Sequence, residues 1–190
     1  VEAVETRNEA LAQQVIAEDA RIDAREVDVE EECLKALALH QPVAIDLRFI
    51  VAVLKIDNDL ERIGDLAVNI AERAVHLSRQ ADPGLQFDFP DMSERVQAIV
   101  RLTLDAFINM DAQAARKVLD LDTEIDNMHR EAIQRIKTRL SEAPEHLDSL
   151  FNLLSVSRQL ERIADHAMNI AEDTIYMIEG RIVRHAGPPG

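Results

Sequence analysis

The chain repeats part of itself at a spacing of 100 residues, and this internal repeat limits the folds that it can adopt. Between Leu60 and Glu72, ten of thirteen positions are identical to the positions 100 residues later. Unrelated segments would share roughly one identity in such a window, so the match indicates a duplication. Two upstream aspartates recur 103 residues later, Asp19 and Asp23 as Asp122 and Asp126.

Apolar residues within each copy recur at helical spacing. In the first copy they are separated by steps of four and three residues, which is typical of one face of an α-helix. The 190 residues include only five Gly and six Pro, so long stretches carry no helix breaker. The pattern predicts an all-α fold made of two tandem three-helix bundles. The apolar stripe of the first copy is Ile56, Leu60, Ile63, Ala67, Ile70 and Ala74.

Prolines and polar segments divide the chain into units. We expect a first three-helix repeat over 1–80, a linker over 81–91, a second repeat over 92–185, and a disordered tail over 186–190. The expected helices are 6–39 and 42–78 in the first copy, then 93–110, 111–140 and 144–184 in the second. The first copy has too few residues for a counterpart of 93–110. We therefore expect its first helix to be truncated and the natural protein to be longer at this end.

The composition argues against several classes of partner. The formal net charge is −15, with 36 acidic residues against 21 basic ones, which disfavours nucleic acid and anionic lipid. The longest apolar run, 49–54, is far too short to span a membrane. A single cysteine excludes a disulfide framework within the chain. We expect a cytoplasmic protein.

Each repeated segment places a glutamate and an aspartate four residues apart, and an asparagine and a second glutamate continue the same helix face. About seven acidic pairs at this spacing would arise by chance, and the chain has nine. The spacing alone is therefore not informative. The residues concerned are Glu61, Asp65, Asn69 and Glu72 in the first copy, and Glu161, Asp165, Asn169 and Glu172 in the second.

The register between neighbouring helices is more informative. If the chain folds back near Pro42, Asp23 lies level with Glu61 and Asp19 with Asp65. The second copy, folding back near Pro144, places Asp126 level with Glu161 and Asp122 with Asp165. Four carboxylates then converge in each copy, which suits a hard cation such as magnesium, calcium, manganese or oxidised iron. The alternative is a solvated acidic seam bridged by Arg62 and Arg162.

Two histidines lie near these stripes. His129 follows Asp126 by three residues, and a solvated histidine is favoured there over a further ligand. We expect His166 to be a surface or partner contact. No nucleophile, base and acid grouping is evident, so we expect no enzymatic activity. A ferritin-type di-iron oxidase would need Glu-x-x-His on two helices, and a helical scaffold without metal is a further alternative.

Two segments resemble the PhoU family of phosphate-transport regulatory proteins. They are HQPVAIDLRFIVAVLKIDNDLERIGDLAVNIAERA at 40–74 and QLERIADHAMNIAED at 159–173. The resemblance implies two three-helix bundles related by a pseudo-twofold axis. It also implies metal binding at the eight carboxylates named above, with iron first and magnesium, manganese, calcium or zinc as alternatives. Glu26 and Glu30 stand where the second copy has His129 and Ile133, so the two sites should differ.

The same resemblance implies a function. Such a protein is a negative regulator of the phosphate-starvation response and of phosphate uptake. It acts as an adaptor between the ATPase subunit of a phosphate ABC transporter and a sensor histidine kinase, and it forms homodimers. An accessory protein of another phosphate carrier is the alternative within the same family.

Overall fold

The computed structural model describes residues 1–85 and 87–181, without the side chain of Asp122. Every regular element in these ranges is helical, as the periodicity predicts. The elements are α1 (Glu2–Glu5), α2 (Glu9–His40), α3 (Ile45–Ser78), α4 (Phe89–Ile108), α5 (Ala112–Leu119), α6 (Asp122–Glu142), the 3₁₀ turn η1 (Pro144–His146) and α7 (Leu147–Glu179).

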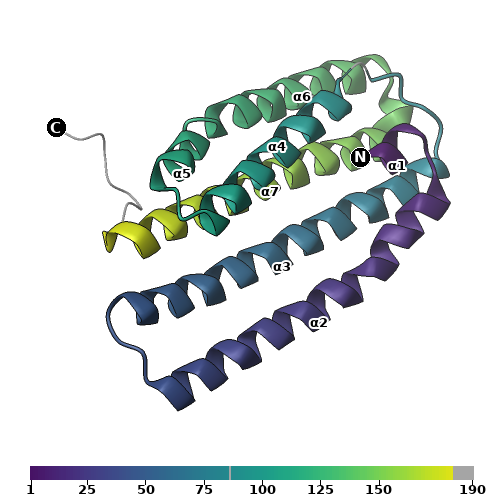
Figure 1. Cartoon of the computed structure of the whole chain (residues 1–190). Helices are drawn as coiled ribbons and strands as arrows, with labels where there is room; N and C mark the ends of the chain where they lie inside the picture. The colour runs from purple at the N-terminus through teal and green to yellow at the C-terminus, as the bar shows by residue number, and fades with distance from the viewer. Residues whose placement is uncertain (86, 182–190) are drawn as a thin grey trace.

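Two long helices, α3 and α7, form the centre of the molecule. They pack side by side along most of their length, and each is also one arm of a hairpin, α2–α3 in the first repeat and α6–α7 in the second. Figure 1 shows the α2–α3 hairpin on one side of the molecule and α4, α5 and α6 gathered around α7 on the other. The duplicated segments therefore lie face to face at the joint between the repeats.

Side-chain caps determine where two of the helices begin. The Asn8 side chain accepts a hydrogen bond of 3.0 Å from the Leu11 N–H at the start of α2. The Asp88 side chain does the same for the Asp91 N–H, at 2.9 Å. Pro90, expected in the linker, instead occupies the first turn of α4, where a missing N–H costs nothing. The prediction that this helix starts at 93 is therefore wrong by four residues.

Backbone turns shift other helix ends from their predicted positions. Helix α3 begins at Ile45 and not at 42, because Gln41 and Ala44 adopt positive φ angles of 45° and 51°. The helix expected over 111–140 is interrupted between α5 and α6. There the N–H of Leu121 bonds to the carbonyl of Val118, three residues back, in a tighter turn.

The last long helix ends at Gly180. Its φ of 68° forms a left-handed cap whose N–H bonds to the Tyr176 carbonyl at 2.8 Å. The prediction that this helix continues to 184 is therefore wrong, because it ends at Glu179. The predicted tail over 186–190 lies outside the described residues.

Helix α1 occupies the position in the first repeat that the last turn of α4 occupies in the second repeat. Arg7 after α1 and Met110 after α4 both have a φ of 52°. Each is followed by a side chain that caps the next helix, Asn8 or Asp111. The first repeat therefore has one helical turn where the second has the twenty residues of α4, and its first helix is short as expected.

The hydrophobic core is centred on α7. Burial is almost complete for several of its residues, including Leu150, Val156, Ala167 and Ile170. Helix α2, in contrast, buries only Ala12 and Cys33 along its 32 residues, so it is an edge helix that rests on α3. None of the helices in the described ranges is long and apolar enough to cross a membrane.

Candidate functional site

The α2–α3 hairpin brings the four carboxylates predicted for the first repeat to one level. Burial, followed by the charges of Asp23 and Asp65, raises the pKa of Asp19 above its ordinary value. Burial and then the charge of Asp65 raise the pKa of Glu61, Arg62 opposes this shift, and Glu26 and Asp23 of α2 add to it. Asp19 therefore lies near Asp65, and Glu61 lies near Glu26 as well as Asp23.

Gly64 allows the two helices to approach closely at this level. A Cβ added to Gly64 would lie 3.0 Å from Cδ1 of Ile22 and 3.7 Å from Oδ1 of Asp19. The second repeat has Ala164 at the equivalent position. Because a glycine lacks a Cβ, the backbone of α3 can lie directly beneath Asp19 and Ile22 of α2.

A further acidic group lies one turn along the hairpin. Burial, with the charges of Glu26 and Glu30, raises the pKa of Asp57 to about 6. The sequence analysis missed Asp57, although its position four residues before Glu61 continues the same helix face. The second repeat has Ser157 at the equivalent position, so this acidic group is confined to the first repeat.

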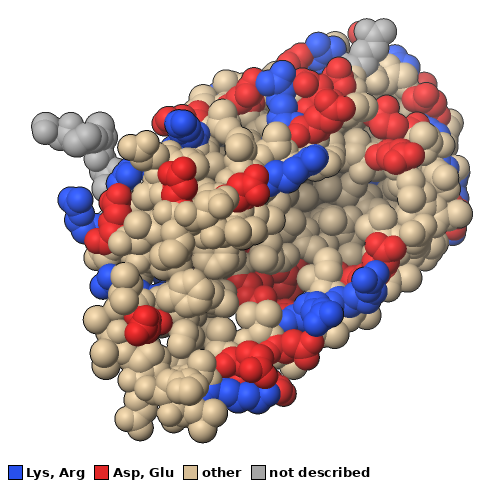
Figure 2. All heavy atoms as spheres, in the orientation of Figure 1, with Lys and Arg blue, Asp and Glu red and all other residues tan. Residues whose placement is uncertain are grey.

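One arginine competes with any cation at this site. The Arg62 guanidinium lies 3.2 Å from Oδ2 of Asp65 and 3.5 Å from Oε2 of Glu61. That Glu61 oxygen is buried and accepts no hydrogen bond. Figure 2 shows basic and acidic side chains interleaved along α2, with further acidic side chains in the hollow behind it.

The donor chemistry of this cluster fits a hard metal ion. Its donors are carboxylate oxygens, which magnesium, calcium, manganese and ferric iron prefer, and one of them lacks a hydrogen bond. Across the described side chains, however, no three His, Cys, Asp or Glu residues are close enough to hold one ion as they stand. Binding therefore requires side-chain rotation and release of Arg62.

The second repeat is arranged differently. Nδ1 of His129 lies 2.9 Å from Oγ of Ser157. Burial lowers the pKa of His129, Arg158 lowers it further and Asp126 opposes this shift. Asp126 also pairs with Arg130 at 3.7 Å.

The remaining predicted ligands of this repeat belong to α6 and α7. On α7, Glu161 is half-buried and Asp165 is exposed. Asp122 begins α6, and its side chain is outside the described set.

The asparagines and glutamates that continue the predicted helix faces have contacts of their own. Glu72 lies 3.6 Å from the neighbouring Arg73, while Asn69 and Glu172 are half-buried. The Asn169 amide donates to Oδ1 of Asp59, at 3.3 Å.

The interpretation of His166 as a surface or partner contact is wrong. Its Nδ1 lies 2.7 Å from the same Asp59 oxygen. The packing of α7 against α3 turns His166 inward, toward the other repeat.

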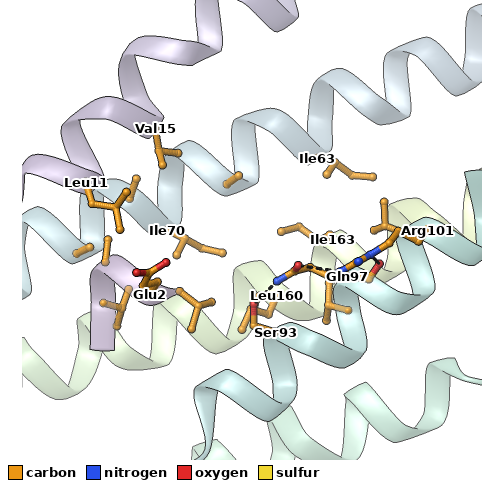
Figure 3. A pocket seen from close by; sticks show the side chains of 18 residues that line it. Glu2, Leu11, Val15, Ile63, Ile70, Ser93, Gln97, Arg101, Leu160 and Ile163 are labelled. Carbon is orange, nitrogen blue, oxygen red and sulfur yellow. Dashed lines mark hydrogen bonds between the residues drawn. The ribbon is translucent and has the colours of Figure 1, made fainter. Parts of the chain in front are cut away.

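An apolar hollow of about 740 Å³ lies between the two repeats. In Figure 3, Leu11, Val15 and Ile63 line one side of it, and Leu160 and Ile163 the other. One wall is polar, where Arg101 bonds to Gln97 and Gln97 to Ser93 along α4. Such a surface suits an apolar side chain or helix face better than a small charged substrate.

Comparisons with known proteins agree with this architecture. A family model described as "PhoU domain" matches residues 1–74 and 89–174, once in each repeat. A "Phosphate-specific transport system accessory protein PhoU homolog" from Pseudomonas aeruginosa is 39% identical over 188 residues, covering 98% of this chain and 78% of the relative. A homologue of the same description from Aquifex aeolicus is 42% identical over 186 residues, covering 97% and 83%.

Two crystal structures share the fold. PhoU from Pseudomonas aeruginosa superposes with a TM-score of 0.90 at 37% identity, covering 94% of this chain and 86% of that one. The phosphate transport system regulatory protein PhoU from Streptococcus pneumoniae gives a TM-score of 0.84 at 27% identity, covering 95% and 85%. With both repeats matched in sequence and in structure, the chain belongs to the PhoU family.

Proposed function

We propose that this protein is a negative regulator of phosphate uptake and of the phosphate-starvation response, and that a bound metal ion sets its regulatory state. Membership of a family of phosphate transport accessory proteins supports the regulatory part. The converging carboxylates of the α2–α3 hairpin support the metal part.

The observation that carries the metal proposal is the geometry around Glu61. One of its oxygens is buried without a hydrogen bond, and the charges of Asp65, Glu26 and Asp23 act on this carboxylate. A cation held by Asp19, Asp23, Glu61 and Asp65 would remove this repulsion. The equivalent ligands in the second repeat are Asp122, Asp126, Glu161 and Asp165. Iron is the first candidate from the family resemblance, followed by magnesium, manganese, calcium and zinc.

We further propose that the protein is a cytoplasmic homodimer without enzymatic activity. In this role it contacts the ATPase subunit of a phosphate transporter and a sensor histidine kinase. The relatives' description as accessory proteins of a transport system supports a partner within that system. The net charge of −15 suits a basic patch on such a partner.

Thermal melting tests the metal proposal, because an ion that binds only the folded state raises the melting temperature. The wild-type chain, stripped with chelator, should melt higher after addition of ferric iron or one of the four divalent ions. The Asp65→Ala, Asp165→Ala double variant should lose this gain. An Asp28→Ala variant, which removes a well-exposed carboxylate from α2, should keep it. A wild-type melt indifferent to all five ions would favour the metal-free scaffold.

Complementation tests the regulatory proposal. In a strain lacking the gene, the wild-type chain should restore repression of a phosphate-starvation reporter in high phosphate, and the double variant should not. Failure of the wild-type chain to bind either the transporter ATPase subunit or the kinase domain would contradict the adaptor role. Oxygen consumption on loading with ferrous iron would instead favour the di-iron oxidase.

A further inference from the structure

The joint between the two repeats is closed by different means at its two ends. At one end the chain itself crosses from α3 to α4 through residues 79–88. The hydrophobic core reinforces this end, since it takes in Leu66, Ile70, Ala74 and Leu77 of α3. Among the described residues, none of α3 before Ile63 belongs to that core cluster.

In the other half of α3, where Ala52 and Ile56 are also buried, polar contacts to α7 add to the apolar packing. Oδ1 of Asp59 lies 2.7 Å from Nδ1 of His166 and 3.3 Å from Nδ2 of Asn169. The Lys55 ammonium donates to Oδ1 of Asp173 at 3.0 Å. Both carboxylates are buried, with Asp59 only 8% exposed and Asp173 only 3% exposed. A buried charge that loses its partner is strongly unfavourable, so these contacts resist separation of the helices.

The internal repeat supplies a built-in comparison. The positions equivalent to Asp59 and His166 at the linker end are Gln159 and Leu66. Oε1 of Gln159 is buried and accepts no hydrogen bond. The hydrogen-bonded arrangement of Asp59 is thus absent from the equivalent place in the same fold, and the duplication alone does not account for it.

We infer that Asp59, His166, Asn169, Lys55 and Asp173 form a clasp between the repeats at the end remote from the linker. When the clasp opens, the α2–α3 hairpin moves away from α7 while the linker end stays packed. The acidic cluster of α2 and α3 moves with this hairpin. The clasp therefore provides a two-position element of the kind that rigid-body switches use.

Amide hydrogen exchange on the full chain tests the clasp. The substitutions Asp59→Gln and His166→Leu each install the residue found at the equivalent position of the other repeat. Each should speed exchange over 45–60 by about 10- to 100-fold, with exchange over 70–78 unchanged. The double variant should exchange no faster than the worse single variant, because the two residues are partners. Additive effects, or equal acceleration along all of α3, would overturn the clasp.

Two further variants cover the case in which the first pair fails to fold. Lys55 is about half exposed, so Lys55→Met should fold and should give the same local pattern at smaller size. Arg73→Met changes the position equivalent to Asp173 at the linker end and should leave 45–60 unaffected. Faster exchange over 45–60 in Arg73→Met, with no change in Lys55→Met, would also overturn the clasp.

Spin labels measure the movement directly. In a Cys33→Ala background, labels at Val51 and Arg181 report the clasp end, and labels at His76 and Phe151 report the linker end. Adding Lys55→Met should lengthen or broaden only the first distance distribution. An unchanged first distribution, or equal broadening of both, would contradict the inference.

Discussion

Asp57 is a carboxylate whose ionisation the fold opposes. Burial and the charges of Glu26 and Glu30 raise its pKa from 3.8 to about 6. Since the folded protein then binds this proton more tightly than the unfolded chain, ionisation of Asp57 destabilises the fold. The penalty is absent below about pH 4, grows as the pH rises toward 6 and is complete above it.

Replacing Asp57 with the residue of the other repeat should therefore stabilise the protein at neutral pH. Asp57→Ser should raise the urea midpoint at pH 7.5 in chelator, and this gain should shrink to nothing as the pH falls toward 4. The control Asp28→Ser removes an exposed carboxylate and should change little at either pH. A gain for Asp57→Ser that is constant with pH would show that packing, and not charge, is responsible.

Arg62 supplies the positive charge nearest to Glu61 and Asp65. If it competes with a metal ion, Arg62→Gln should tighten binding of Mn²⁺ by about tenfold, the factor that corresponds to about 1.4 kcal/mol. Calorimetric titration measures this change. Arg25→Gln, which removes an exposed arginine that pairs with Asp28, is the matched control. Weaker binding in Arg62→Gln would show that this arginine helps to shape the site.

At the scale of elements, one side chain joins the start of the first repeat to the end of its last helix. The Arg7 guanidinium donates to the carbonyls of Leu77 and Gln80, at 2.9 and 2.5 Å. It adds a charge-assisted hydrogen bond to each of these two carbonyls at the end of α3. Arg7→Ala should lower the free energy of unfolding by about 1 to 3 kcal/mol, measured by urea denaturation. Arg25→Ala, on an exposed turn of α2, should change it by less than about 0.5 kcal/mol.

Helix α2 should be the first long helix to open. It buries only two residues, so detaching it exposes little apolar surface and requires less free energy than global unfolding. In native-state hydrogen exchange, its amides should show lower protection than those of α7, with a smaller dependence on denaturant. Equal protection of α2 and α7 would mean that the hairpin and the rest of the chain unfold as one unit.

Sequence periodicity predicts elements whose partners belong to the same repeat. The register of Asp19 and Asp23 against Glu61 and Asp65 follows from counting along two helices that fold back at one turn, and the charges of these residues act on one another in the folded chain. Helix ends are less predictable, because a proline can end a linker or begin a helix. For Pro90, the side-chain cap at Asp88 shows that the proline begins α4 and does not end the linker.

Contacts between the repeats could not be predicted in this way. His166 follows an acidic residue on a polar face, and nothing local indicates that α3 will cover it. Its partner Asp59 belongs to the other repeat, so the pairing depends on how two copies dock and not on the period of either. Asp57 was missed for another reason. Its pKa is raised first by burial and then by the charges of Glu26 and Glu30 on the neighbouring helix, and single-helix spacing reveals neither.

At the scale of the whole molecule, the two repeats share one core. Ala167 of α7 is fully buried within the cluster that also holds Leu66 of α3 and Val96 of α4. Ala167→Leu should therefore loosen both repeats together and lower the free energy of unfolding by about 1 to 3 kcal/mol. Ala114→Leu, at a half-buried position on α5, should cost less. A single cooperative urea transition in both variants is the expected result, and two separate transitions would contradict a shared core.

The antiparallel pairing of α3 with α7 also has a bearing on ancestry. The two helices occupy equivalent positions in the two repeats, and they contact each other through equivalent surfaces, as two identical copies would in a symmetric dimer. A single ancestral copy could have built the same contact by self-association, before gene fusion put both partners on one polypeptide. Because both partners now belong to one polypeptide, equivalent positions can carry different residues, as Asp59 and Gln159 do.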